Sequence, residues 1–541
     1  MLSGRSAKNV PHSRFHAYHN YPHIAVRKAA LVIALAIFAC VVPRTIPNDT
    51  GNKHDLQDRQ IDRTRDRVPD RTSLDVVKLP GAPHRGRTGR RVTHTALPNG
   101  VRLVVWRDQD SPVVAMRALW RGGLLAETPQ KRGITHLLAR VITRGCGGMS
   151  ADQIAGMARR ENGHLDAVSG RDSFGLRSEW PVDGWPVGLE LMARCILGPD
   201  LDFAEINAQR QLIDDEIRQR SGDGDFVAFR AFAETLYRAH PYRMSATGWG
   251  ESPAAIGRRE LTAFYRERYP VSGLTLSIVG NVDPVEAMAL VRSHFGAAAP
   301  RPVGLPERPT ESSGSRPARM REVYRYIERD DARLVVGFPG TTLGNRDRHA
   351  LAVAAAVLDV RLARALRRRG LSRSSRVYSV PGIDPGYVIA QIRCRPAEVA
   401  AAFEIARSVI DAMVARPAGP AELEAAGRAL IAAHTESRNR PGSAATALAF
   451  HEAHGLGARA YLDYGDAIHR VTQRDVARVV AAYLVWDRKI SATIAPRAAS
   501  PEAERRMRGT WRRAPNTGRA PSTGPRQRVH RYRPGDSARR R

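Results

Sequence analysis

The chain has 541 residues, a formal net charge of +31 and 43% hydrophobic residues. A chain of this length is too long to fold around one ordinary hydrophobic core, and it allows two domains of about 200 residues with additional tails. The hydrophobic content excludes a chain that is disordered throughout. The positive charge therefore belongs to a protein that is largely folded.

Residues 29–42 form an apolar run that follows Arg27 and Lys28. This run is shorter than the about 20 residues that span a membrane, and it fits the core of a secretion signal. Residues 37–40 approximate a bacterial lipoprotein cleavage site, so Cys40 is a candidate for lipid attachment. We expect an exported protein, either periplasmic or anchored to the membrane at the cell envelope.

The predicted elements occur in two similar series. Residues 44–91 alternate acids and bases, which is typical of a linker. The patterns then predict strands at 101–106 and 112–120 and helices at 133–143, 151–160 and 185–197. After a proline-rich boundary at 297–319, they predict a strand at 333–338, a helix at 347–366, a strand at 386–392 and a helix at 397–415. The two halves, about 95–300 and 320–497, look like divergent copies of one plan.

The end of the chain is strongly basic. Residues 501–541 are rich in arginine, proline, glycine and serine, and their acidic residues are Glu502, Glu504 and Asp536. Such a segment cannot bury enough apolar surface to fold. It could bind nucleic acid, anionic lipid or an acidic partner, but no aromatic pattern for base stacking accompanies it. We favour a solvated tail and expect no specific nucleic-acid binding.

The cysteines do not indicate a disulfide framework. Beyond Cys40 the chain contains Cys146, Cys195 and Cys394. We expect these three to be buried small hydrophobic residues and not reactive thiols.

Several motifs occur in a shared order that resembles the insulinase and mitochondrial-processing-peptidase-like family of zinc metallopeptidases. In chain order they are residues 97–101 (LPNGV), 121–123 (RGG), 133–136 (GITH), 163–172 (GHLDAVSGRD), 240–242 (HPY), 276–283 (LSIVGNVD) and 366–371 (LRRRGL). The resemblance covers about residues 95–497. It implies an α+β class with two homologous domains, each a mostly antiparallel sheet packed with helices, forming a clamshell around a peptide-sized chamber.

The resemblance and the composition together give a domain plan. The expected segments are a signal or anchor (1–42), a disordered charged linker (43–94), an N-terminal peptidase-like domain (95–300), a Pro-rich linker (301–319), a C-terminal peptidase-like domain (320–497) and a disordered Arg-rich tail (498–541).

The family holds zinc with an inverted His-x-x-Glu-His motif on a helix, and a distant Glu completes the ligands. Here His136 matches the first ligand and Glu216 matches the distal one, although Glu216 could also be an ordinary helix-face carboxylate. Ala139 stands at the position of the general base, and Arg140 stands at that of the second His. A catalytic zinc needs three protein ligands and a proton acceptor, so we expect zinc binding to be weak or absent.

Arg140 carries a permanent positive charge on the side of the helix that would hold the metal. We expect it to form an ion pair with Glu216. Nearby, Asp214 or Asp215 could take the place of Glu216 in a salt bridge.

The family also contacts the substrate backbone with an Arg and a Tyr from the C-terminal domain. Arg367 or Arg368 fits the Arg. Arg373 stands where the Tyr would follow, and Tyr378 can serve only if residues 372–377 are an insertion. We therefore predict Arg367 and Tyr378 as substrate-binding residues, with a basic loop as the alternative.

No replacement catalytic site is visible in the sequence. His451 and His454 lie three residues apart, but Gly455 stands where His-Glu-x-x-His would need its second His. We expect this segment to be a solvated helix end.

Three functions are compatible with these observations. We favour a catalytically inactive homologue that binds peptide or forms a hetero-oligomer with an active zinc peptidase subunit. One alternative is an active zinc metalloendopeptidase with an altered ligand set. The other is an envelope protein whose basic surface binds acidic partners.

Overall fold

The computed structural model describes residues 75–78, 91–244, 256–304, 321–371 and 374–496. The predicted signal segment, most of the predicted Pro-rich linker and the predicted tail lie outside the described residues. In the described part of the chain, no helix has the length and apolar character that crossing a membrane requires.

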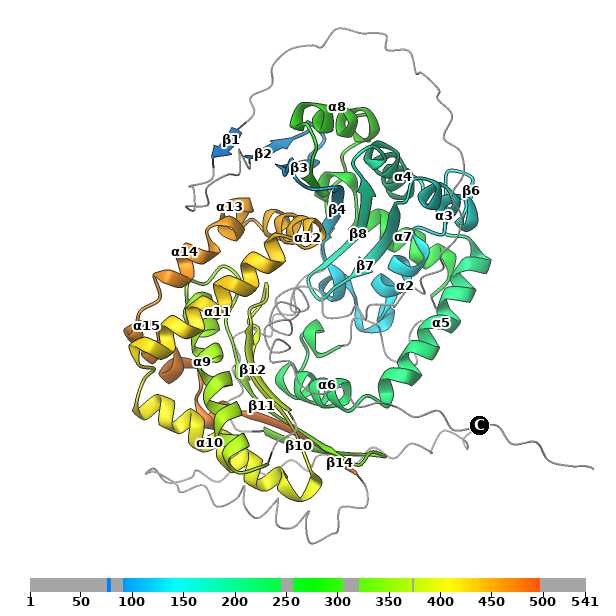
Figure 1. The fold of residues 1–541 in the computed structure, drawn as a ribbon. Helices are drawn as coiled ribbons and strands as arrows, with labels where there is room; N and C mark the ends of the chain where they lie inside the picture. The colour runs from blue at the N-terminus through cyan, green and yellow to red at the C-terminus, as the bar shows by residue number, and fades with distance from the viewer. Residues whose placement is uncertain (1–74, 79–90, 245–255, 305–320, 372–373, 497–541) are drawn as a thin grey trace, which may run out of the picture. The chain divides into compact units, whose positions relative to one another are not determined.

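The first sheet has seven strands in the order β1-β2-β3-β9-β4-β8-β7 (Figure 1). They are β1 (Asp75–Lys78), β2 (Arg91–Ala96), β3 (Arg102–Arg107), β4 (Val113–Arg121), β7 (His164–Ser169), β8 (Ser173–Pro181) and β9 (Thr275–Gly280). Neighbours are antiparallel except β3 and β9. Since β1 lies within the expected disordered linker and β2 begins there, ordered structure starts earlier than the charge pattern predicts.

The helices of this half are α2 (Ile134–Val141), α3 (Ala151–Arg160), α4 (Trp185–Leu197), α5 (Phe203–Ser221), α6 (Gly224–Leu236), α7 (Arg258–Arg268) and α8 (Pro284–Phe295). A short hairpin, β5 (Gly145–Cys146) and β6 (Met149–Ser150), follows α2. The carboxylate of Asp202 accepts hydrogen bonds from the amides of Ala204 and Glu205, and this cap fixes the start of α5.

The second sheet repeats this topology with five strands in the order β10-β14-β11-β13-β12. They are β10 (Arg321–Ile327), β11 (Ala332–Pro339), β12 (Ser374–Val380), β13 (Tyr387–Cys394) and β14 (Ile490–Pro496). β10 and β14 are parallel and the other neighbours are antiparallel, as in the series β3-β9-β4-β8-β7. The expectation that the two halves share one plan is therefore confirmed strand by strand.

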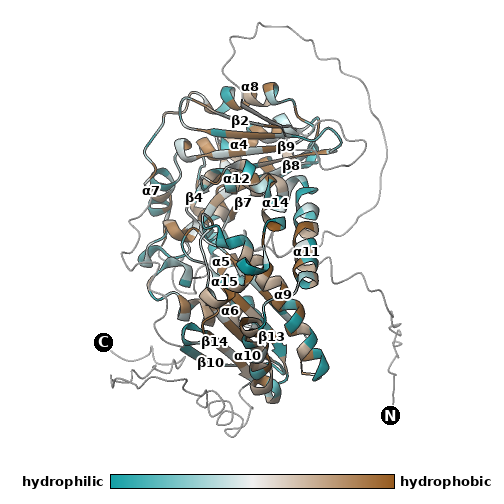
Figure 2. Ribbon diagram, turned by 90° about the vertical axis from the view of Figure 1, so that its left-hand side faces the viewer, coloured by the Kyte–Doolittle hydropathy of each residue, from teal (hydrophilic) through white to brown (hydrophobic). Residues whose placement is uncertain are grey.

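The helices of the second half are α9 (Asp347–Arg368), α10 (Val399–Ala415), α11 (Pro420–Arg438), α12 (Pro441–Ala453), α13 (Gly457–Leu462), α14 (Tyr464–His469) and α15 (Gln473–Tyr483). Figure 2 shows apolar residues along the strands and mixed colouring along α9 and α11. Half-buried helices show this alternation because only one face of each packs on the protein. The elements expected from periodicity all form, with ends shifted by a few residues.

Each half also contributes one helix to the sheet of the other half. The apolar side of α12 packs on β4 and β9, where Leu448 joins a buried cluster with Val104 and Trp106. Conversely, α6 packs on β11 and β14, with Phe232 beside Val335. The sequence pattern did not predict this exchange, because an apolar helix face does not specify the sheet it covers.

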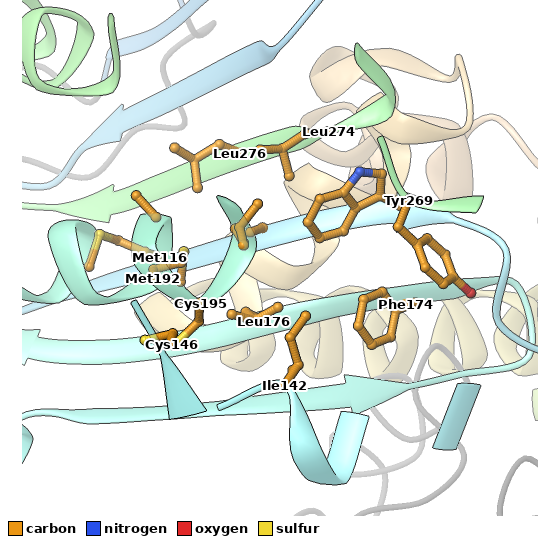
Figure 3. Close-up of a cluster of buried hydrophobic side chains, with 14 of the residues drawn as sticks. Met116, Ile142, Cys146, Phe174, Leu176, Met192, Cys195, Tyr269, Leu274 and Leu276 are labelled. Atoms are coloured by element: carbon orange, nitrogen blue, oxygen red, sulfur yellow. Dashed lines mark hydrogen bonds between the residues drawn. The ribbon is translucent and has the colours of Figure 1, made fainter. Parts of the chain in front are cut away.

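The first core lies between the first sheet and its own helices (Figure 3). Trp120, Phe174 and Tyr269 pack as an aromatic group, with ring centroids 4.4 Å apart for Phe174 and Tyr269. Cys146 and Cys195 lie in the same core, and Cys394 is buried in the second half. The expectation that these three cysteines are buried is confirmed.

Candidate functional site

The helix that carries the degenerate motif, α2, is capped by a distant carboxylate. Its N-cap is Gly133, which has no side chain and a left-handed φ of 81°. The carboxylate of Glu127 instead accepts hydrogen bonds from the amides of Gly133 (2.9 Å) and Thr135 (3.2 Å). Burial raises the pKa of Glu127 to about 7, although these amides oppose the shift. Sequence reasoning missed Glu127, because it lies outside the helix it caps.

A close backbone approach brings the β7–β8 hairpin to the 3-10 turn Gly123–Ala126, which precedes α2. A Cβ on Gly123 would lie 2.1 Å from the carbonyl oxygen of Gly170, so this position requires glycine. The adjacent Ser169 ends β7, and its Oγ lies 3.1 Å from Nδ1 of His136. The Arg-Gly-Gly motif therefore helps to set the neighbours of the remnant ligand.

The structure brings His136 and Glu216 together, as the resemblance implies. Nε2 of His136 lies 3.3 Å from Oε2 of Glu216. The other carboxylate oxygen, Oε1, lies 2.7 Å from Nη2 of Arg220, one turn further along α5. The hydrogen bond with His136 lowers the pKa of Glu216, and the charges of His136, Arg220 and Arg140 add to this effect against burial.

The prediction that Arg140 forms an ion pair with Glu216 is wrong. Among the described residues, Glu216 forms ion pairs with His136 and Arg220, and no ion pair involves Arg140. Nε of Arg140 is buried without a hydrogen-bond partner in the described part of the chain. Arg220 was missed because it lies outside the motif, although its spacing of four residues from Glu216 is the helical signal for such a pair. Of the two alternative carboxylates, Asp214 and Asp215, the second pairs with Arg218.

The donor set at this position does not fit a catalytic zinc. His136 and Glu216 supply two donors, whereas such a zinc takes three protein ligands. The described residues contain no group of three or more His, Cys, Asp or Glu side chains arranged to hold a metal. At the general-base position, Ala139 is 5% exposed and has no ionisable group. The site therefore offers one imidazole and one carboxylate, both held by hydrogen bonds. It has no ionisable side chain at the position of the general base.

A large cavity of about 750 Å³ lies near this site. The residues just after Ser169 (Gly170, Arg171 and Asp172) line it, as do Phe226 and Phe229 of α6, Tyr237 just after α6, and alanines of α9 and α11. Its size lies within the range of small-molecule and peptide-side-chain sites, and its lining is mainly apolar.

The two predicted substrate-binding residues have different surroundings. Tyr378 lies on β12 and lines the cavity, and its hydroxyl donates to Oε1 of Gln391 at 3.3 Å. Burial raises its pKa. Arg367 lies in the last turn of α9, is exposed and is not among the cavity-lining residues. The structure therefore does not bring Arg367 and Tyr378 together at the cavity.

A polar network at the cavity edge joins the two halves. Oδ2 of Asp384 lies 2.9 Å from Nε2 of His240, and Tyr242 donates to the carboxylate of Asp172. The guanidinium of Arg171 lies 4.3 Å from the ring centroid of Tyr242. Four of these five residues belong to the sequence motifs described above. Asp384 could not be predicted from the sequence, because its partner His240 lies 144 residues away.

The segment with His451 and His454 is not a solvated helix end. Both side chains are half-buried, and His451 lines the cavity. Burial lowers the pKa of His451 to about 4 and also lowers that of His454. The prediction failed because α12 ends against the first half, where Nε2 of His454 lies 3.2 Å from the carbonyl oxygen of Asp172.

Two family descriptions match successive parts of the chain. "Insulinase (Peptidase family M16)" matches residues 103–248, and "Peptidase M16 inactive domain" matches residues 255–430. An uncharacterised zinc protease of Streptomyces coelicolor is 25% identical over 332 residues, which is 59% of this chain and 71% of the relative. One from Mycobacterium tuberculosis is 27% identical over the same length, covering 59% and 74%.

Solved structures show the same fold. A protease from Helicobacter pylori superposes with a TM-score of 0.70 at 16% identity, over 75% of this chain and 100% of that protein. A peptidase M16 inactive domain from Pseudomonas fluorescens gives 0.69 at 17% identity, over 76% and 99%. The shared topology, the motif order and the two sequence matches lead to one conclusion: the chain belongs to the peptidase M16 (insulinase) family.

Proposed function

We propose that this protein is a catalytically inactive M16 homologue that binds peptide, either alone or beside an active zinc peptidase subunit. The observation that carries the proposal is the remnant site. His136 and Glu216 are engaged with Ser169 and Arg220, while buried Ala139 offers no proton acceptor. Two separate requirements for metal-assisted hydrolysis, the third ligand and the base, are missing from the motif.

The cavity supports the binding half of the proposal. Its volume of about 750 Å³ and its apolar lining suit several side chains of an extended peptide. Aromatic residues of α6 and small residues of α9 and α11 give contact area without blocking the space. Loss of catalysis leaves this surface intact, because the cavity residues differ from His136 and Glu216.

Hydrolysis and metal content of the purified chain test this proposal. We expect less than one zinc per chain after dialysis and no cleavage of an unfolded peptide, with or without chelator. Fluorescence anisotropy with the same labelled peptide should still report binding. Chelator-sensitive cleavage by the isolated chain would show that the altered site is active and would overturn the proposal.

Pairing and location belong to the same proposal. We propose export to the cell envelope on the strength of the apolar run at 29–42, with Cys40 as the candidate lipid site. Fractionation of cells and mass analysis of the mature N-terminus check both points. Co-purification with an M16 subunit that carries an intact His-x-x-Glu-His motif, followed by faster cleavage than that subunit gives alone, is the expected result for a partner.

A further inference from the structure

Six of the residues that line the cavity come from the second half and lie close together. They are Arg348 and His349 on α9, His434 on α11, His451 on α12, and Tyr461 and Tyr464. The rings pack against one another, with centroids 4.7 Å apart for His434 and Tyr461 and 4.6 Å for His434 and Tyr464. We call these six residues the His–Arg cluster.

The histidines of the His–Arg cluster are neutral at physiological pH. Burial lowers the pKa of His349, His434 and His451 to about 4, and the charge of Arg348 lowers that of His349 further. His349 accepts a hydrogen bond on Nε2 from Nε of Arg348 at 3.0 Å, as a neutral imidazole can. His434 is 5% exposed, and its Nε2 has no hydrogen-bond partner among the described residues.

Arg348 is a half-buried cation without a carboxylate partner in the described part of the chain. Its Nη1 donates to the carbonyl oxygen of Leu343 and its Nε to His349, and its Nη2 donates to no acceptor among the described residues. Two other arginines that line the cavity have carboxylate partners: Arg171 pairs with Asp172, and Arg230 pairs with Glu234. An uncompensated charge at the wall of an apolar cavity is costly, and an anion placed there would offset that cost.

The space next to the His–Arg cluster is apolar. Small side chains from facing helices line it, namely Ala352, Ala355, Ala356, Ala425, Ala429 and Ala433. A ligand that fits both regions carries one negative group at its end and apolar groups behind it.

We infer that the His–Arg cluster binds the C-terminal carboxylate of an apolar peptide, with Arg348 as the charged donor. This inference rests on the proposed peptide binding and adds the end of the peptide that is recognised. A planar guanidinium with a free Nη2 suits a carboxylate, and such a charge-assisted hydrogen bond is stronger than a neutral one.

A matched pair of peptides tests the inference with the full chain. One is a short peptide of leucine, alanine and serine with an N-terminal fluorophore and a free C-terminal carboxylate, and the other ends in an amide. We expect the acid to bind about 10- to 100-fold more tightly than the amide. Arg348→Gln should remove this preference, while Arg346→Gln, a change at an exposed neighbouring arginine, should keep it. Arg348→Lys, which retains the charge, should keep part of it and covers the case in which Arg348→Gln does not fold.

The outcomes separate the two ideas. Equal binding of acid and amide overturns the carboxylate assignment and leaves peptide binding in place. Failure of both peptides to bind overturns the proposed function together with the inference. Arg348-dependent binding of a fatty acid without binding of either peptide would reassign the cluster to lipid carboxylates and overturn the peptide assignment.

Discussion

Oε1 of Glu216 lies 2.7 Å from Nη2 of Arg220 on the same helix, and this pair occupies the carboxylate that Arg140 was expected to bind. Both partners are partly buried, at 26% and 19% side-chain exposure. Partial burial makes the pair worth more than an exposed helical pair of about 0.5 kcal/mol.

A double-mutant cycle measures this relationship. We expect Glu216→Gln and Arg220→Gln to show a coupling of about 1 kcal/mol in urea unfolding. The matched cycle with Arg140→Gln should give a smaller value, because Arg140 acts on Glu216 only through longer-range charge. A larger coupling for Arg140 than for Arg220 would contradict the observed pairing.

Restoring the second ligand should restore metal binding. Arg140→His places an imidazole four residues after His136 on α2, where side chains share a face. We expect zinc content after dialysis to rise toward one per chain, since three donors then surround one position. Arg144→His, at an exposed position beyond the end of α2, is the control and should leave the zinc content unchanged. Equal zinc uptake by both variants would mean that the added imidazole binds nonspecifically.

Glu127 should make stability depend on pH. Burial raises its pKa from 4.5 to about 7, so the folded chain keeps a proton that the unfolded chain releases in this range. The contribution of the Glu127 proton to the free energy of unfolding is therefore fully present below pH 4.5 and is lost as the pH rises through about 7. The free energy of unfolding falls by at most about 3 kcal/mol over this range. Glu127→Gln should remove this part of the slope in urea unfolding at several pH values. The control is Glu161→Gln, an exposed carboxylate; identical slopes for wild type and Glu127→Gln would refute the assignment.

Cys146 and Cys195 should cross-link on mild oxidation. Their Sγ atoms lie 3.2 Å apart in the first core, so a shift of about 1 Å reaches bonding distance (Figure 3). With copper phenanthroline as the oxidant, the two thiols lose two protons and two electrons and form one disulfide. Peptide mass analysis should find this bond, and Cys394 should remain a thiol. Cys195→Ser should abolish it, and a Cys146–Cys394 bond would contradict the placement.

The exchanged helix α12 should support the first sheet. Leu448 is fully buried against Val104 and Trp106, so Leu448→Ala should lower the free energy of unfolding by about 2–5 kcal/mol. Val414→Ala removes the same kind of apolar surface at a position that is 48% exposed, and should cost less than about 0.5 kcal/mol. Equal effects from both variants would show that α12 does not stabilise the sheet as described.

The sequence by itself determined the local elements and the family. Strand and helix periodicity located elements such as β4, α4 and α9 within a few residues, because buried and exposed side chains alternate along the sequence with the period of each element. The resemblance also assigned His136 and Glu216 to one site, and the structure brings Nε2 of His136 to 3.3 Å from Oε2 of Glu216.

The tertiary structure decided which distant groups meet. Glu127 caps α2 from outside that helix, and α6 and α12 cross to opposite sheets. Both arrangements depend on how the elements pack. The position of Arg348 among neutral histidines has the same origin, since its neighbours come from α9, α11 and α12. Periodicity reports which face of an element is buried, whereas only packing specifies what lies against that face.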